Sequence, residues 1–291
     1  MTTRGVVLDS ALGLQARRGP LAKLLRAVLY AALAYVFAGP LLAVCVGAFV
    51  RVPDPTKLTL IPNGFTLDNF RTAIDRDVLH YLWNSLSVVG LGLLLQVLVS
   101  TLAAYALARK RFVGATLVML ACLATMMMPE EVLAIPLSLV LADVPVVHVN
   151  LMGSLAGMIV PVVAWGFSIL VMTEFMREVP VELEEAARID GAGDMRIFWT
   201  IVLPLCRPAL GVIAIFGFAM IWDQYILPLL VATDSSSFTL PVALRSIRTD
   251  PDVGIGVVLA GSLLALLPSV VVFLVLQRSF MRGLTSGAIK G

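Results

Sequence analysis

Charged residues are scarce in this sequence. Asp, Glu, Lys and Arg make up only 14% of the 291 residues, whereas 59% of the residues are hydrophobic. Soluble domains carry roughly 25% charged residues. A soluble chain could not cover so much apolar surface with polar side chains, so the composition indicates that the lipid bilayer is the solvent. The net charge of +2 is too small to indicate a nucleic-acid partner.

Cysteine and histidine are equally scarce. Cys45, Cys122 and Cys206 are far apart in apolar stretches, and no pair has the spacing of metal ligands. They are predicted to be small buried hydrophobic residues. His80 and His148 fall in segments predicted to be external and form no cluster. The sequence therefore predicts neither a metal site nor a catalytic histidine.

Two further patterns are missing from the chain. No G-x-x-x-x-G-K-[ST] phosphate loop occurs, so the chain itself is not expected to hydrolyse ATP. No repeat of 20–50 residues and no low-complexity tract is found, which favours a single domain.

Long apolar runs, in contrast, are abundant. Six segments reach the roughly 20 residues that cross a bilayer core of ~30 Å. They lie near residues 24–50, 82–108, 113–136, 151–173, 199–230 and 254–277. The fifth contains three prolines and is expected to begin below the membrane surface. Residues 1–23 are predicted to be a cytoplasmic arm; their twin arginine is not read as an export signal, because the apolar run that follows is too long.

Basic residues indicate the orientation. With six spans, fifteen of the 21 Lys and Arg residues fall on one side, which is then cytoplasmic. The sequence thus predicts an all-α membrane protein with six transmembrane helices and both termini in the cytoplasm. The external connection at 51–81 is expected to hold short helices, and residues 137–150 are expected to form an external turn or a short interfacial helix.

One cytoplasmic stretch differs from the rest of the chain. Pro180 suits the first position of a helix, Gly191 suits a left-handed helix end, and Asp194 suits the N-cap of a following helix. The helix dipole favours acidic residues in the first turns, here Glu182, Glu184 and Glu185. A short charged helix below a membrane domain is a candidate docking element, although a solvated connector helix would look similar.

The spacing in this stretch resembles a known motif. Glu185-Ala186-Ala187, three residues, Gly191, nine residues and Ile201-x-Leu203-Pro204 match the EAA loop of ABC importer permeases at all seven fixed positions. The resemblance implies that a loop at about 177–204, within a permease domain of residues 24–291, docks on an ATPase. The residues that it implicates are Glu182, Glu185, Ala186, Ala187, Asp190, Gly191, Ile201, Leu203 and Pro204.

Further runs resemble the maltose-type sugar-permease branch, among them Leu67–Phe70, Asn84–Leu86 and Ala104–Arg109. This resemblance implies a type I ABC importer permease fold in the bacterial cytoplasmic membrane. It also implies a second permease subunit, two ATP-binding subunits that use ATP and magnesium, and an external solute-binding protein. The chain itself is expected to bind no cofactor. The sequence departs from the branch at Trp222–Tyr225 and at Asp143–Asn150.

A polar and aromatic cluster interrupts the fifth apolar run. Trp222, Asp223, Gln224 and Tyr225 combine aromatic faces with hydrogen-bonding groups, which suits a sugar, and Asn84 opens the second span. Polar groups at membrane depth are costly and usually face an interior, so these five residues are candidates for a substrate path. The alternative is that such residues hydrogen-bond neighbouring helices together.

Three functions remain open at this stage. The first is a non-catalytic subunit of an ATP-driven sugar importer, and the second is the same machine carrying a glycerophosphate or glycerophosphodiester. The absence of Lys and Arg from the span interiors, together with Asp223, favours the first. The third is a secondary transporter, which should show inverted repeats and would leave the EAA loop unexplained.

Overall fold

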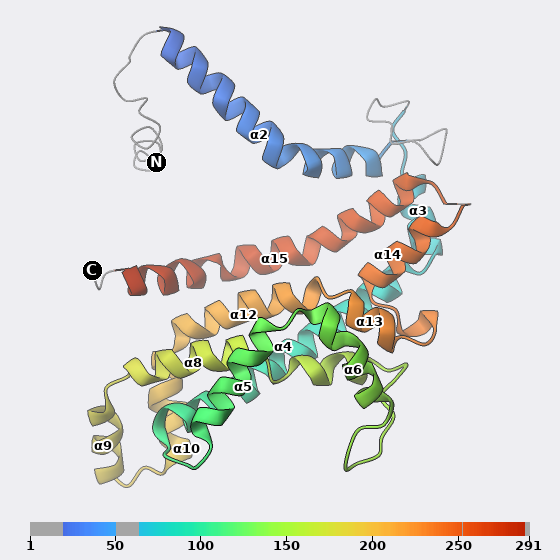
Figure 1. Ribbon diagram of the computed structural model, residues 1–291. Helices are drawn as coiled ribbons and strands as arrows, with labels where there is room; N and C mark the ends of the chain where they lie inside the picture. Colours follow the sequence, from blue (N-terminus) through green and yellow to red (C-terminus); the bar gives the residue numbers. More distant parts are fainter. Residues whose placement is uncertain (1–19, 51–63, 252, 289–291) are drawn as a thin grey trace.

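The computed structural model describes residues 20–50, 64–251 and 253–288, and this part of the chain is almost entirely helical (Figure 1). The predicted N-terminal arm lies, up to residue 19, outside the described residues. Four helical stretches are long and apolar enough to cross a membrane. They are α2 (Pro20–Ala48), α4 (Val78–Arg109), the run Leu155–Glu178 and α15 (Ile255–Ala288).

Two further spans are possible if each of two bent helix pairs crosses the membrane once. The first pair is α5 (Ala115–Met127) with α6 (Glu130–Ala142), bent by 114°. The second is the segment Asp194–Leu205 with α12 (Arg207–Trp222), bent by 77°. The described residues thus provide four to six candidate spans, and the number six and the orientation of the termini stay predictions.

The third predicted span, 113–136, is not one continuous helix. Pro129 disfavours the helical conformation of the residue before it, and Met128 is indeed extended, with φ −89° and ψ 130°. Helix α5 therefore ends at Met127, and α6 starts in a new direction at Glu130. The chain therefore turns sharply inside the predicted span.

The fifth predicted span is broken into short helices, consistent with its three prolines. They are the π-helical turn η3 (Phe198–Val202), α11 (Leu203–Leu205), the longer α12 of 16 residues and α13 (Ile226–Val231), and α10 (Asp194–Ile197) lies just before them. Pro208 and Pro228 both lie in the first turn of a helix, where a missing N–H leaves no hydrogen bond unmade. Each proline is tolerated because a new helix has just begun before it.

The fourth span begins with α7 (Leu155–Ile159) and the 3-10 turn η2 (Val160–Val162), and continues as α8 (Gly166–Glu178). Helix α8 can start close to α5 because Gly166 has no side chain. A Cβ there would lie 2.5 Å from the carbonyl oxygen of Cys122.

Shorter elements connect the spans. Helix α3 (Asp68–Asp75) confirms that the 51–81 connection holds a short helix, although residues 51–63 are not described. Residues 143–150 form a turn closed by the bridge between Val144 and Val149. The 3-10 turn η4 (Ser235–Ser237) and helix α14 (Leu240–Thr249) connect α13 to α15, and α9 (Val181–Ile189) connects α8 to α10.

The centre of the bundle is formed by α4, α8 and α12, which contact one another, while α15 packs on α12 and α2 packs on α15 (Figure 1). Deep inside, Gln96 donates a hydrogen bond of 2.9 Å to Ser168, which confirms the expected role of polar residues between helices. Outer helices expose apolar side chains such as Phe37 and Phe273, as lipid contact requires.

Candidate functional site

The EAA loop lies at one end of the bundle, where α9 stands between α8 and α10 (Figure 1). Helix α8 ends because Pro180 holds Val179 in an extended conformation, with φ −69° and ψ 127°. Helix α9 then starts at Val181. The sequence analysis had placed Pro180 at the first position of this helix, but Pro180 is the residue before it.

The end of α9 is a tight turn built around Gly191. This residue has φ +83°, the left-handed conformation that the sequence analysis predicted. The amide of Gly191 donates to the carbonyl of Arg188 at 3.0 Å, and the amide of Ala192 donates to that of Ala187 at 2.9 Å. This pair of hydrogen bonds is the Schellman motif, which fixes the direction in which the chain leaves α9.

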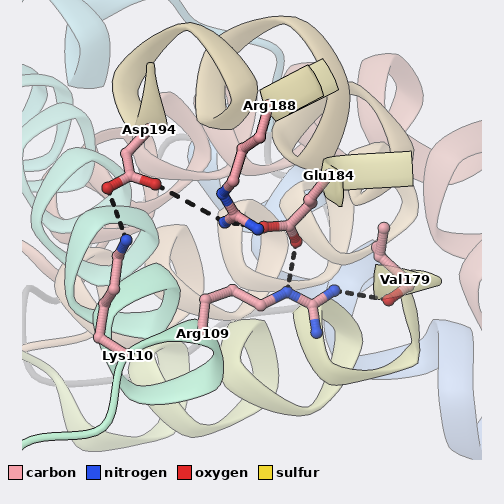
Figure 2. Close-up of polar contacts among 6 residues, drawn as sticks. All are labelled: Arg109, Lys110, Val179, Glu184, Arg188 and Asp194. Atoms are coloured by element: carbon pink, nitrogen blue, oxygen red, sulfur yellow. Dashed lines mark hydrogen bonds and ion pairs between the residues drawn. The ribbon is translucent and has the colours of Figure 1, made fainter. Parts of the chain in front are cut away.

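A buried ion pair connects α9 to the end of α4 (Figure 2). Arg109 Nε lies 2.5 Å from Glu184 Oε1, and the side chains are only 7% and 1% exposed. Arg109 Nη2 also donates to the carbonyl oxygen of Val179 at 2.5 Å. Removing one partner of such a pair costs roughly 3–5 kcal/mol, because the other charge is left buried without compensation. One side chain of α4 therefore contacts both the residue that links α8 to α9 and the middle of α9.

A second, more exposed set of ion pairs extends this contact to α10. Lys110 Nζ lies 2.6 Å from Asp194 Oδ2, and Arg188 Nη2 lies 3.6 Å from Asp194 Oδ1 and 3.2 Å from Glu184 Oε2. The hydrogen bond from Lys110, assisted by Arg188, lowers the pKa of Asp194 below its usual value, so that this carboxylate keeps its charge to a lower pH than an unpaired aspartate does.

The predicted N-cap role of Asp194 was wrong. Gly193 precedes α10, and its position receives no side-chain hydrogen bond. Asp194 is the first residue of the helix, and its carboxylate points to Lys110 and Arg188 (Figure 2). Two basic side chains outcompete the backbone amides for this carboxylate.

Apolar packing supports the same junction. Side chains of α4, α8, α10, η3 and α12 form one buried cluster, against which Ala187, Ala192 and Leu203 pack. Phe198 is completely buried in it, which contributes roughly 1.5–3 kcal/mol. The buried members are Ala104, Tyr105, Met172, Met176, Val179, Ile197, Phe198, Val202, Cys206, Ala209 and Ile213.

The residues that the motif implicated fall into two groups. An exposed group lies on α9 and its turn, and it comprises Glu182, Glu185, Ala186, Asp190 and Gly191. A half-buried group faces the bundle, and it comprises Ala187, Ile201, Leu203 and Pro204. The exposed group forms a free face, whereas the half-buried group anchors the loop.

The sequence analysis missed the buried ion pair. It used Arg109 and Lys110 as indicators of orientation and Arg109 in a family resemblance, and the motif pointed to Glu182 and Glu185 but not to Glu184. A signal was present, because a basic residue ends the apolar helix α4 and needs a carboxylate if it is buried. The pattern could not tell which of the three glutamates of α9 faces α4.

A cavity of about 500 Å³ lies where several helices break. Its wall includes the first turn of α6, the residue before α8, the end of α12 and the start of α13. A second cavity of about 220 Å³ shares Glu130, Trp165 and Gln224 with it. The two cavities therefore form one hollow region at the junction of four helix ends.

The structure brings three of the five predicted path residues to this cavity: Asp223, Gln224 and Tyr225. Trp222 instead stacks on Phe218, with ring centroids 5.6 Å apart, and lines a separate cavity of about 230 Å³ between α12 and α15. Asn84 is buried elsewhere and donates hydrogen bonds to the carbonyl oxygens of Ser236 and Phe238, 2.8 and 3.0 Å away.

A bundle of long apolar helices, with a short helix held at one end by ion pairs and an open cavity where several helices break, is the architecture expected of a membrane permease. Residues 96–284 match the family model described as the binding-protein-dependent transport system inner membrane component. The chain belongs to this family, and its apolar helices are those of a multi-pass membrane protein.

Known relatives agree with this assignment. The chain is 31% identical over 281 residues to the arabinooligosaccharides transport system permease protein AraQ of Halalkalibacterium halodurans, covering 94% of this chain and 99% of the relative. It is 38% identical over 191 residues to the sn-glycerol-3-phosphate transport system permease protein UgpE of Yersinia pestis, covering 65% and 66%.

A solved structure shows the same fold. A chain from the crystal structure of a bacterial ABC transporter involved in the import of the acidic polysaccharide alginate superposes with a TM-score of 0.77 at 21% identity. The match covers 91% of this chain and 98% of that chain. The described helices thus have the arrangement of an ABC importer permease.

Proposed function

We propose that this chain is the permease subunit of an ATP-driven, binding-protein-dependent importer for a sugar or oligosaccharide, and that α9 couples it to an ATPase. The observation that carries the proposal is the buried pair of Arg109 and Glu184, which ties an exposed docking helix to a spanning helix. A docking helix on a soft connector would lose the motion of its partner. Here the exposed residues Glu185 and Ala186 remain free to meet that partner.

The machine requires other subunits. A second permease completes the translocation path, two ATP-binding subunits hydrolyse ATP with magnesium, and an external solute-binding protein delivers the solute. This chain is the non-catalytic membrane subunit and binds no cofactor of its own. The family match and the absence of a phosphate loop from the sequence support this division of roles. The proposed location is the bacterial cytoplasmic membrane, in agreement with the description of the family as an inner membrane component.

A glycerophosphate or glycerophosphodiester is the second candidate cargo, because UgpE is among the relatives. Reconstitution separates the two. The complex is placed in proteoliposomes with its cognate solute-binding protein outside and ATP inside, and uptake of radiolabelled arabinotriose and sn-glycerol 3-phosphate is measured. ATP-dependent uptake of the sugar supports the proposal. Uptake of the phosphate alone supports the second candidate, and uptake without the ATPase subunits would indicate a secondary transporter.

We expect six spans with both termini inside, because fifteen of the 21 basic residues then lie on the cytoplasmic side. An impermeant thiol reagent applied outside intact cells should label a cysteine introduced at position 60. It should miss cysteines introduced at positions 5, 190 and 288. Labelling at position 190 from outside would overturn both the orientation and the docking role of α9.

Of the predicted path residues, Asp223, Gln224 and Tyr225 line the cavity at the junction of α12 and α13, and the substrate path is expected to include these three. A solvated path explains why Asp223 is tolerated, since a carboxylate facing lipid would be costly. The Asp223→Ala variant should lower the uptake rate or change substrate preference while the complex still assembles. Normal transport of every substrate by the variant with all three residues changed to Ala would exclude this site.

A further inference from the structure

The charge of the hollow region is one-sided. Glu130 and Glu131 in the first turn of α6 and Asp223 at the end of α12 all line the 500 Å³ cavity. Among the described residues that line this cavity and its neighbour, none is Lys, Arg or His. Three carboxylates without a facing cation give a cavity a negative potential, and low-dielectric walls focus that potential into the space between them.

Aromatic rings in the wall act in the same direction as the carboxylates. Trp165, Phe216 and Tyr225 line the same cavity. The ring of Phe167 packs against two of them, and its centroid lies 4.8 Å from that of Trp165 and 5.4 Å from that of Phe216. Aromatic faces pack against apolar surfaces and attract cations, but they offer nothing to an anion.

One polar group in the wall is without a partner. The side-chain oxygen of Gln224 is buried and accepts no hydrogen bond from the described residues, although Gln224 lines both cavities. A buried acceptor left unsatisfied costs roughly 1–3 kcal/mol, so a side-chain rotation that turns this oxygen into the cavity would let a donor from a bound solute relieve it. Carboxylates likewise accept hydrogen bonds, and sugar hydroxyl and ammonium groups donate them.

We propose that this cavity is a solute subsite that admits neutral or positively charged sugars and disfavours phosphorylated or carboxylated ones. Glu130, Glu131 and Asp223 set its charge preference. The volume of about 500 Å³ lies within the ~300–1,000 Å³ of small-molecule sites. This inference rests on the proposed import function and assigns the selection against anions to this subunit.

Thiol reactivity measures the potential inside the cavity directly. Ala219, which is exposed and lines the cavity, is replaced by Cys after Cys45, Cys122 and Cys206 have been changed to Ala. The assembled complex in lipid nanodiscs is treated with a trimethylammonium or a sulfonate methanethiosulfonate reagent. Each rate is divided by the rate at which the same reagent reacts with free cysteine, so that differences in intrinsic reactivity cancel. The cationic reagent is expected to react roughly tenfold faster than the anionic one, because the negative potential attracts it. Tenfold in rate corresponds to about 1.4 kcal/mol in activation free energy.

Neutralising the three carboxylates provides the decisive comparison. In the Glu130→Gln/Glu131→Gln/Asp223→Asn background, the ratio of the two rates should fall to within about twofold of unity. The matched control, Asp143→Asn/Asp234→Asn, removes carboxylates that do not line the cavity and should keep the ratio. Equal rates before neutralisation, a ratio that survives it, or no reaction with either reagent would each overturn the inference.

This outcome is independent of the proposed function. The thiol rates require neither transport nor a sugar, so a complex that imports something else would still show the charge preference. Conversely, sugar uptake with a rate ratio near one would leave the importer assignment intact and remove only the subsite.

Discussion

The Gly191→Val variant is expected to assemble in the membrane but to lose most of the stimulation of ATP hydrolysis by loaded binding protein, at least fivefold. Gly191 has φ +83°, and no atom lies within 4 Å of the position where a Cβ would stand. The penalty is therefore a backbone penalty, roughly 1–3 kcal/mol for a side chain held in the left-handed region. The turn should therefore change its conformation, and α10 should leave α9 in a different direction.

The neighbouring glycine supplies the control. Gly193 has φ −75° and ψ 162°, an extended conformation that valine favours, and open space surrounds its Cβ position. The Gly193→Val variant should therefore keep near-normal stimulation in the reconstituted complex. Glu185→Lys, which reverses a charge on the exposed face of α9, should reduce stimulation without altering the turn. Wild-type stimulation in both Gly191→Val and Glu185→Lys would place the coupling element elsewhere.

The second large effect is expected at the buried ion pair. Glu184→Leu leaves Arg109 buried with only the carbonyl of Val179, at a cost of about 3–5 kcal/mol, and should lower the midpoint of thermal unfolding of the complex. Arg109→Leu should be milder, because Glu184 keeps Arg188 at 3.2 Å. Stimulated ATP hydrolysis should fall in the same order.

The double variant Arg109→Leu/Glu184→Leu tests the explanation. It removes both charges, so it should unfold at a higher temperature than Glu184→Leu alone. An exposed pair serves as the matched control: Glu174→Gln breaks the contact with Arg177, which is largely exposed, and should change stability by less than about 1 kcal/mol. A double variant as unstable as the sum of the single variants would show that the two side chains act independently.

The features that could be predicted from the sequence are those set by short-range chemistry. The left-handed Gly191 follows from the needs of a helix end, and the apolar runs follow from the thickness of a bilayer. The break at Pro129 follows from a local rule of the same kind, but the apolar run continues on both sides of this proline, so the sequence analysis predicted a single span there. A proline inside an apolar run therefore indicates a change of helix direction even where the hydrophobicity does not change.

The features that could not be predicted depend on which distant segments meet. Three glutamates in two turns of α9 look equivalent in the sequence, and only the packing of α9 against α4 makes Glu184 the buried one. Asp194 has an ordinary capping sequence, yet Lys110, 84 positions away, holds its carboxylate. The acidic cavity likewise combines helix ends that are remote in the chain.

The guanidinium of Arg109 bridges a joint as well as forming an ion pair. It holds Val179, the residue before Pro180, and Glu184, four residues after that proline. A proline junction between two helices would otherwise act as a pivot, because it lacks the hydrogen bonds that stiffen a continuous helix. Because one side chain contacts both sides of the junction, α8 and α9 are expected to move together. If an ATPase docks on α9 as proposed, a displacement of α9 is expected to reach the last turn of α4 directly through this side chain.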